Sequence, residues 1–340
     1  MNPEKAGKKE PMTQAQYTNI LVTTRELGRT GIHISPIGLG TAQFSEGKMY
    51  YQALTQFQVD AIIKVALDGS ITWFDTAEGY GGGRSERALA AGLTHAGKKP
   101  GEVAVATKWE PYFRTAGNIE RTIENRIANL APFPVDLHQI HVPFGSLSSI
   151  RTQVRAMGRL VKAGKIRAVG VSQFSARRME IAYEELAKLG IPLASNQVQI
   201  NLLHRKIETN GVLETARRLG VTLIAFWPLH GGLLTGKFHA DSTLAARLPR
   251  FRRMINGLSD KSLDRTTPLI EGMREIAAAH QATISQIALA WLVNYYGDTV
   301  VAIPGASKPH HAEEAAGALK VALSKAELQR LADLSASVTG

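Results

Sequence analysis

Four polar residues of types that transfer protons lie at or near the ends of short apolar runs. Asp75, Lys108 and His141 each end such a run, at intervals of 33 residues, and Tyr80 follows Asp75 in a glycine-rich segment. An ammonium beside a phenol lowers the phenol pKa from its ordinary value near ~10. These residue types predict an acid-base site. Tyr80 would donate a proton, Asp75 would keep Lys108 charged, and His141 would donate a hydrogen bond to a substrate oxygen.

The interval of 33 residues suits one strand, one helix and the loops of a parallel βα unit. Runs rich in Val, Ile and Leu alternate with segments of helical periodicity, which predicts a parallel sheet covered on both faces. Eight such units favour closure into an α/β (β/α)8 TIM barrel, whose strands deliver side chains to one rim. The expected strands are 37–41, 71–75, 103–108, 136–141, 166–172, 195–201, 221–227 and 299–305.

Other segments are expected to lie outside the repeating units. RELGRTGIHIS predicts an N-terminal β-hairpin, and SKAELQRLADL predicts an extra C-terminal helix over the rim or the barrel bottom. The stretch from Leu229 to about Asp260 shows no clear periodicity, so a long loop acting as a lid is expected after strand seven. Residues 1–24 are interpreted as a flexible tail and 25–340 as one domain. A doubly wound sheet would need a G-x-G-x-x-G turn, which IGLGTAQFS lacks.

Composition restricts the classes of function. The 340 residues contain no cysteine, which excludes disulfides and thiolate chemistry and is compatible with the cytoplasm, the expected compartment. The net charge of +11 is spread along the chain, without the interleaved aromatics of a base-stacking surface, so attraction of small anions is favoured over nucleic acid. No apolar run approaches the ~18 residues of a membrane span, and the polar opening is unlike a secretory signal.

Each candidate residue also has a structural interpretation or another chemical one. Asp75 could cap a loop, and its contact with Lys108 could be a purely structural ion pair. His138 and His141 have the spacing of a metal pair, but an odd offset on a strand points them to opposite faces, so no metal is expected. A glycosidase could pair Asp75 with Glu78 or Glu110, although this leaves Lys108, Tyr80 and His141 without a role.

The motifs follow the order found in a known family. Between Arg25 and Leu334 the chain contains, in sequence, RELGRTGIHISPIGLGT, FDTAEGYGGGRSE, ATKW, HQIHVP, GKIRAVGVSQFS, NQVQINLLHR, GGLLTGKF and IPGASKPHHAEE. It resembles the aldo-keto reductases, especially the branch with potassium-channel β subunits, aflatoxin-aldehyde reductases and pyridoxal reductases. The resemblance implies a nicotinamide cofactor bound without a Rossmann fold, and a catalytic tetrad of Asp75, Tyr80, Lys108 and His141.

The resemblance also implies cofactor contacts. Ser172, Gln173 and Gln197 match positions that bind the nicotinamide carboxamide, with Gln173 where Asn is more usual. Phe226 matches the aromatic on which the ring stacks. The segment after strand seven matches one that folds over the pyrophosphate with main-chain N–H groups and a cation. The remaining predicted contacts are Gly40, Thr41, Trp227, Pro228, Leu229, Gly232, Leu234, Lys237, Ile303, Gly305 and Glu314.

The resemblance also implies which nicotinamide cofactor the protein prefers. Ser307, Lys308 and His311 match the region that meets a 2′-phosphate, although His311 stands where Arg or Gln is commoner and Ala315 where Asn often contacts adenine. The charge of Lys308 and the nearby helix start favour NADP(H), with NAD(H) as the alternative.

A small carbonyl substrate is expected, with Trp109 and Phe144 in its pocket. Aromatic aldehydes are the first expectation and pyridoxal the second. The resemblance also leaves open an NADPH-binding sensor subunit with slow turnover, and it does not fix the oligomeric state.

Overall fold

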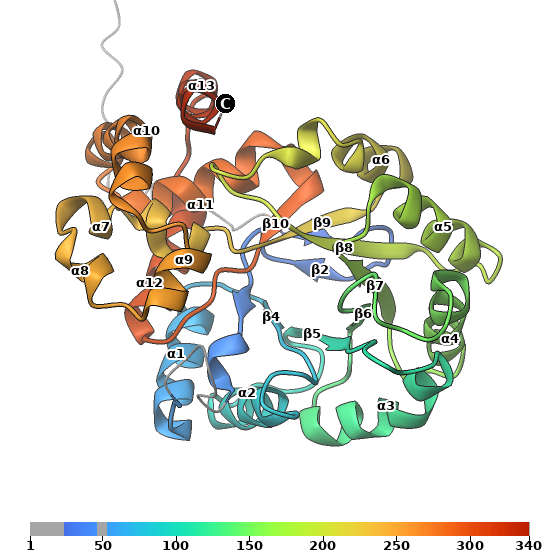
Figure 1. Ribbon diagram of the computed structural model, residues 1–340. Coiled ribbons are helices and arrows are strands. Elements are labelled where there is room, and N and C mark those ends of the chain that lie inside the picture. The colour runs from blue at the N-terminus through green and yellow to red at the C-terminus, as the bar shows by residue number, and fades with distance from the viewer. Residues whose placement is uncertain (1–23, 46–52, 340) are drawn as a thin grey trace, which may run out of the picture.

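The core of the protein is a barrel of eight parallel strands (Figure 1). The structure is a computed structural model that describes residues 24–45 and 53–339, so the predicted N-terminal tail lies almost entirely outside the described residues. All eight expected strands are present, in chain order around the sheet, with ends that differ by a few residues from the predicted ones. They are β3 (Leu39–Gly40), β4 (Trp73–Asp75), β5 (Ala104–Trp109), β6 (Leu137–Ile140), β7 (Ala168–Ser172), β8 (Leu193–Gln199), β9 (Thr222–Phe226) and β10 (Val300–Ala302).

The strand register explains how the equal spacing brings polar side chains together. Asp75 is level with Ala106, so Lys108 lies two residues further along the neighbouring strand. Lys108 is in turn level with Gln139, two residues before His141. Residues two positions apart lie on the same face of a strand, and a closed barrel requires a stagger of this kind between its strands. Asp75, Lys108, Gln139 and His141 therefore all belong to the inward face.

The barrel is closed along its seam and at its amino-terminal end. Parallel bridges join Ile37 to Ala302 and Gly40 to Gly305, which links β3 to β10. The predicted hairpin is formed by β1 (Arg25–Glu26) and β2 (His33–Ile34). Its apolar residues pack with the inward residues at the bottom of the strands, in a cluster that includes Leu27, Ile32, Ile34, Trp73, Leu137, Ala194 and Ile224.

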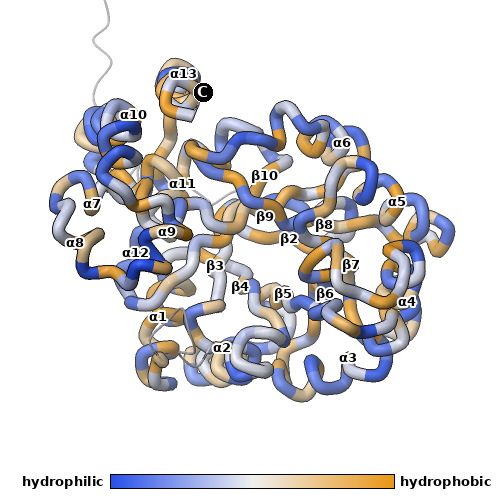
Figure 2. Tube along the Cα trace, viewed as in Figure 1, coloured by the Kyte–Doolittle hydropathy of each residue, from blue (hydrophilic) through white to orange (hydrophobic). Residues whose placement is uncertain are grey.

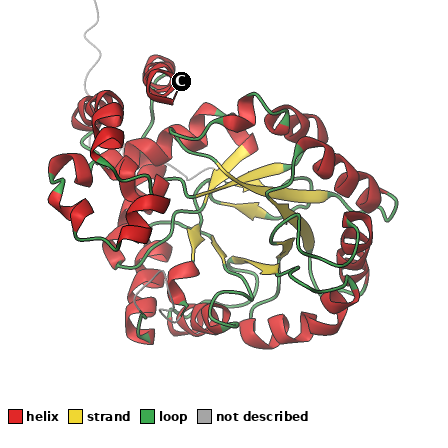
Figure 3. Ribbon diagram, viewed as in Figure 1, coloured by secondary structure: helices red, strands yellow, loops and turns green. Residues whose placement is uncertain are grey.

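Helices form the outer layer (Figure 3). The predicted helical segments are confirmed, and several begin at polar caps: the Ser149 and Ser175 side chains accept hydrogen bonds from the main chain three residues on. Figure 2 shows hydrophobic and hydrophilic residues interspersed along both the strands and the outer helices. The helices between strands are α1 (Gln56–Asp68), α2 (Arg84–His95), α3 (Gly117–Leu130), α4 (Ile150–Lys162), α5 (Ala176–Ala187) and α6 (Val212–Leu219).

The segment after β9 differs from the expected loop. It contains a 3-10 turn at His230–Thr235 and three short helices, α7 (Lys237–Ala240), α8 (Thr243–Ala246) and α9 (Arg250–Ile255). Helices this short are fixed by packing, and their apolar side chains form a small separate core, which explains why no periodicity was visible in the sequence. This core contains Leu233, Phe238, Ala245, Leu258 and Leu263.

The chain then continues through α10 (Asp260–Ala279), α11 (Ile284–Tyr295), α12 (Pro309–Gly317) and α13 (Lys325–Thr339). Helix α13 was expected over the rim or the bottom. It lies on the outer side instead, against α10 and α11, and Arg205 Nη1 after β8 donates to its Ala332 carbonyl at 2.6 Å. Among the described residues, no single helix has the length and apolar composition of a membrane span. Helices α10 and α11 have this length and composition only when they are taken together, as a pair bent by 94°.

His138 is a buried histidine that faces the helical layer. It is 1% exposed, and among the described residues neither ring nitrogen has a hydrogen-bond partner. Burial and the charge of Arg126 lower the pKa of His138 to about 3. The unfolded chain takes up this proton near pH 6.5 and the folded chain does not, so stability that is fully present above pH 6.5 is lost as the pH falls toward 3.

We therefore predict that His138→Leu makes the protein less sensitive to acid. Below pH 6.5 this histidine costs about 1.4 kcal/mol of unfolding free energy per pH unit, or about 2 kcal/mol by pH 5. Urea unfolding should show that the free energy of unfolding falls less between pH 7.5 and pH 5 in the variant than in the wild type. The exposed His33→Gln serves as control and should keep the wild-type difference. Equal acid losses in wild type and His138→Leu would contradict the prediction.

Candidate active site

The carboxyl ends of the barrel strands surround a cavity of about 570 Å³. Asp75, Tyr80 and His141 line one part of it, and Lys237 and His311 line another. Among the predicted cofactor contacts, only Leu234 and Lys308 are absent from the lining: Leu234 is buried in the core, and Lys308 is exposed at the start of α12. The others all line it: Gly40, Thr41, Ser172, Gln173, Gln197, Phe226, Trp227, Pro228, Leu229, Gly232, Lys237, Ile303, Gly305, Ser307, His311 and Glu314.

A buried ion pair lies at the base of the cavity. Lys108 Nζ donates to Asp75 Oδ1, and the two side chains are 0% and 2% exposed. The same Nζ donates to the Thr76 carbonyl at 2.9 Å. Asp75 Oδ2 accepts from the side-chain amides of Gln139 at 2.9 Å and Gln197 at 3.0 Å. Both charges therefore have several partners, as buried charges require.

Tyr80 lies above this ion pair. Lys108 Nζ is 5.1 Å from the centroid of the phenol ring. Burial raises the pKa of Tyr80, Lys108 lowers it and Asp75 raises it, with a net increase above the ordinary value. The expectation that Lys108 would bring the Tyr80 pKa below its ordinary value is wrong for this structure, because desolvation of the phenolate outweighs the ammonium. At neutral pH the phenol is therefore protonated, the form that a proton donor needs.

The charge of Lys108 is also fixed by its surroundings. Burial alone lowers the pKa of the ammonium, but its interactions with Asp75 first and Tyr80 second raise it by more, so that the Lys108 pKa lies above its ordinary value. Lys108 consequently stays charged at neutral pH. This agrees with the predicted role of Asp75, which was to hold the lysine in its ammonium form.

His141 completes the group of four. Its ring meets the Tyr80 ring edge to face, with centroids 5.7 Å apart and planes at 80°. Its Nδ1 contacts Glu110 Oε1 at the distance of an ion pair, although not with the angle of a hydrogen bond. All four residues predicted for proton transfer thus lie together on one rim.

The residues predicted to hold the nicotinamide carboxamide lie next to Asp75. Ser172 Oγ donates to the main-chain carbonyl of Gln197 at 3.0 Å, and the main-chain N–H of Gln173 donates to the same carbonyl at 2.8 Å. Gln173 has a φ of 59°, in the left-handed region that Asn adopts more readily than Gln. This backbone conformation gives a physical reason for the Asn usual at this position, and it places local strain at the site.

The other part of the cavity is cationic. Burial and the charge of Lys308 lower the pKa of Lys237. Burial, His310, Lys237 and Lys308 lower the pKa of His311 to about 4. A lysine whose charge is disfavoured by burial and by a neighbouring lysine is suited to bind an anion such as phosphate, and the neutral His311 ring can add a hydrogen bond. Glycines make room beside them: a Cβ on Gly305 would lie 2.2 Å from the Gln43 side chain. These residues fit a nicotinamide dinucleotide.

Both residues predicted for the substrate pocket lie outside the cavity lining. Trp109 is 1% exposed, and its Nε1 donates to Asn118 of α3 at 2.9 Å. It follows inward-facing Lys108 directly, so strand alternation turns it toward the helices, and the prediction was wrong. Phe144 is exposed on the loop after β6, in edge contact with Tyr112.

Sequence reasoning also missed several residues at the site. Gln43, Arg252 and Asn256 line the cavity. Alternation could have identified Gln139, which lies two residues before His141 on the same strand. Arg252 and Asn256 come from the segment after β9, whose short helices gave no pattern to interpret.

The alternative chemistries find little support in this geometry. Glu78 is bound by Arg114 at 2.5 Å and by Arg126, and Asp75 by Lys108, so this carboxylate pair is already engaged in ion pairs. In the described part of the chain, no three His, Cys, Asp or Glu side chains are grouped as metal ligands.

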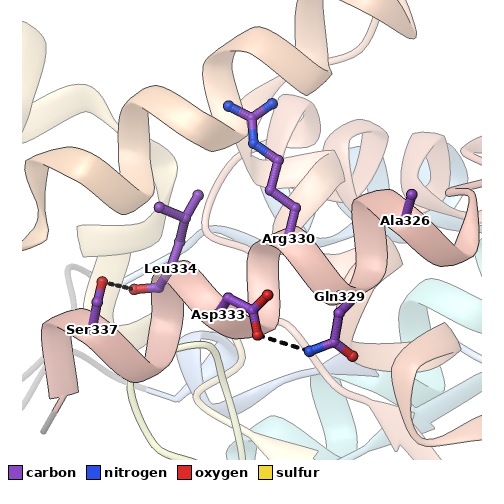
Figure 4. A pocket seen from close by; sticks show the side chains of 6 residues that line it. All are labelled: Ala326, Gln329, Arg330, Asp333, Leu334 and Ser337. Atoms are coloured by element: carbon purple, nitrogen blue, oxygen red, sulfur yellow. Dashed lines mark hydrogen bonds between the residues drawn. The ribbon is translucent and has the colours of Figure 1, made fainter.

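A second hollow lies beside α13 (Figure 4). Its polar side chains bond within the helix, with Gln329 Nε2 donating to Asp333 Oδ1 at 2.8 Å and Ser337 Oγ to the Leu334 carbonyl at 2.8 Å. Arg330 pairs with Glu275 of α10. The polar side chains of this hollow are thus already paired within α13 or with α10.

Comparisons with known proteins agree with the geometry. The model of the aldo/keto reductase family matches residues 36–336. Pyridoxal reductase from the chloroplast of Arabidopsis thaliana is 30% identical over 301 residues, which are 85% of this chain and 80% of that protein. The aldo-keto reductase YhdN of Bacillus subtilis is 32% identical over 302 residues, 84% of this chain and 85% of its own.

A solved structure gives the same result. The aldo/keto reductase of Klebsiella pneumoniae in complex with NADP and acetate superposes with a TM-score of 0.68 at 26% identity, over 92% of this chain and 94% of that one. The family match covers the whole barrel together with Asp75, Tyr80, Lys108 and His141. The chain belongs to the aldo/keto reductase family and is an NAD(P)H-dependent oxidoreductase that acts on carbonyl groups.

Proposed function

We propose that the protein reduces aldehydes and ketones to alcohols with NADPH, and that Tyr80 is the proton donor. The observation that carries this proposal is the Tyr80 phenol at the cavity, whose ring centroid lies 5.1 Å from the Lys108 ammonium, which in turn pairs with the buried Asp75 carboxylate. The family supports carbonyl chemistry in general, and this arrangement supports the assignment of roles.

The residues act on the substrate oxygen. When bound, the cofactor supplies a hydride to the carbonyl carbon. Tyr80 gives its proton to the oxygen as negative charge develops there, and the phenolate that remains is stabilised by Lys108. Asp75 holds Lys108 in place through their ion pair. His141, in contact with the Tyr80 ring, orients the substrate oxygen toward the phenol.

The cationic part of the cavity supports NADPH over NADH. Lys237 and His311 line it, and Lys308 stands at the start of α12 close enough to lower the pKa of both. A 2′-phosphate would relieve the repulsion between Lys237 and Lys308. The Klebsiella pneumoniae relative is described in complex with NADP, which agrees with this preference.

Aromatic aldehydes are the proposed substrates, with pyridoxal as a narrower candidate. The loops that leave β5 and β6 carry exposed apolar side chains at the same end of the barrel as His141: Tyr112, Phe113, Phe144 and Leu147. Main-chain hydrogen bonds join the two loops. The N–H of Phe113 donates to the Gly145 carbonyl at 2.8 Å, and the N–H of Leu147 donates to the Arg114 carbonyl at 2.9 Å. A preformed apolar rim of this kind favours planar, apolar substrates. The similarity to a pyridoxal reductase supports the second candidate.

We predict that Tyr80→Phe lowers kcat by about 10²- to 10⁴-fold, because it removes the proton donor while keeping the ring. NADPH oxidation with a panel of aldehydes would measure turnover, and fluorescence titration would measure the Kd for NADPH. The Kd should stay within a few-fold of the wild-type value. Tyr183→Phe removes a hydroxyl from helix α5, outside the cavity lining, and should leave kcat unchanged. Wild-type turnover by Tyr80→Phe would rule out this mechanism.

A second prediction concerns the phosphate. Lys308→Ala should raise the Kd for NADPH by about tenfold, the effect of losing one charge-assisted contact, and leave the Kd for NADH unchanged. Titrations with both cofactors would measure the ratio. Lys320→Ala, which removes a cation at the opposite end of α12, is the matched control. An equal loss for both cofactors would show that Lys308 does not contact the 2′-phosphate.

A further inference from the structure

Glu110 is a carboxylate at the active site to which the mechanism above gives no role. Its Oε1 contacts Nδ1 of His141 at ion-pair distance, and the two side chains are 20% and 19% exposed. The Nδ1 atom is buried in this contact, whereas His141 itself lines the cavity. Glu110 is absent from the cavity lining, so it reaches the site through the histidine.

The position of Glu110 is itself fixed by a chain of buried charges. Its main-chain N–H donates to Glu78 Oε1 at 2.7 Å. Arg114 pairs with the same carboxylate at 2.5 Å, and Arg126 pairs with its other oxygen. Glu78 and Arg126 are 8% exposed. The backbone at Glu110 is thus anchored to α3 and to the loop after β4.

The loop that carries Tyr80 leaves space for the same carboxylate. A Cβ on Gly79 would lie 2.5 Å from Glu110 Oε1, so a side chain at position 79 would displace the carboxylate. Glu110 therefore packs between the residue that precedes Tyr80 and the ring of His141. Its charge also contributes to the raised pKa of Tyr80.

We propose that Glu110 is a positioning residue for carbonyl reduction, which orients His141 through the close contact of its carboxylate with Nδ1. This inference rests on the proposed function. A carboxylate at Nδ1 fixes that nitrogen as the donor and sets the direction of the ring. Nε2 is then the nitrogen presented to the substrate. It donates to a carbonyl oxygen when the ring is charged and accepts from the product hydroxyl when the ring is neutral.

The kinetic test compares two substitutions. Glu110→Ala should lower kcat about 10- to 100-fold, the usual effect of removing a group that orients an active-site histidine, with the Kd for NADPH and the melting temperature close to wild type. Glu110→Gln keeps an oxygen that can accept from Nδ1–H and should recover most of kcat. Equal losses in Glu110→Ala and Glu110→Gln would overturn the proposal, as would unchanged kcat in Glu110→Ala.

A double-mutant cycle separates action through His141 from direct action. If Glu110 works by orienting the ring, Glu110→Ala should have no further effect on kcat in a His141→Gln background. The same fold loss in both backgrounds would overturn the proposal. Failure of the wild type to reduce any carbonyl with NADPH would instead refute the proposed function, so the two failures are distinguishable.

A spectroscopic readout needs neither cofactor nor turnover. ¹⁵N NMR of histidine-labelled protein, with His141 assigned by loss of its signals in His141→Gln, reports which ring nitrogen carries the proton. We expect Nδ1–H in the wild type and a mixture of tautomers in Glu110→Ala. The pair of His280 and Glu327 has nearly the same exposure, and Glu327→Ala should leave the His141 signals unchanged. An unchanged tautomer in Glu110→Ala would overturn the proposal.

Discussion

The ion pair between Asp75 and Lys108 is the constraint on which the rest of the site depends. Both side chains are almost fully buried, and removal of either partner would leave an uncompensated charge at a cost of about 3 to 5 kcal/mol. The structure meets this constraint with Thr76, Gln139 and Gln197, each bonded to one member of the pair. Gln197 thereby connects the proton-transfer group to the side of the cavity proposed for the nicotinamide.

The barrel makes this arrangement rigid. Lys108 lies two positions beyond the residue level with Asp75, and His141 lies two positions beyond the residue level with Lys108, so the register of the strands brings these groups together. A second set of buried charges, formed by Glu78, Glu86 and Arg126, lies behind the rim and fixes the loops after β4 and β5. Gln173 and Trp227, two of the six described non-glycine residues with a left-handed backbone, lie in the cavity wall.

The strands, and the meeting of Asp75, Lys108 and His141 at one rim, could be predicted from the sequence because they depend on local pattern and equal spacing. What was missed depends on packing. Desolvation, which sets the direction of the Tyr80 pKa, requires knowledge of what surrounds the phenol. The helices after β9 are too short for periodicity to reveal. Trp109 was misplaced although alternation from Lys108 predicts its outward direction, so that error was one of interpretation rather than of missing information.

The hairpin of β1 and β2 limits the routes by which a proton could return to Tyr80 after the proposed reaction. It packs its apolar residues against the lower ends of the strands, so the amino-terminal end of the barrel is sealed. Asp75 and Lys108 lie between this plug and Tyr80 and are themselves shielded from water. The phenol can then recover its proton only from above, by the route that substrate and product also use. In the proposed mechanism, reprotonation of Tyr80 and departure of the product would therefore use the same end of the barrel.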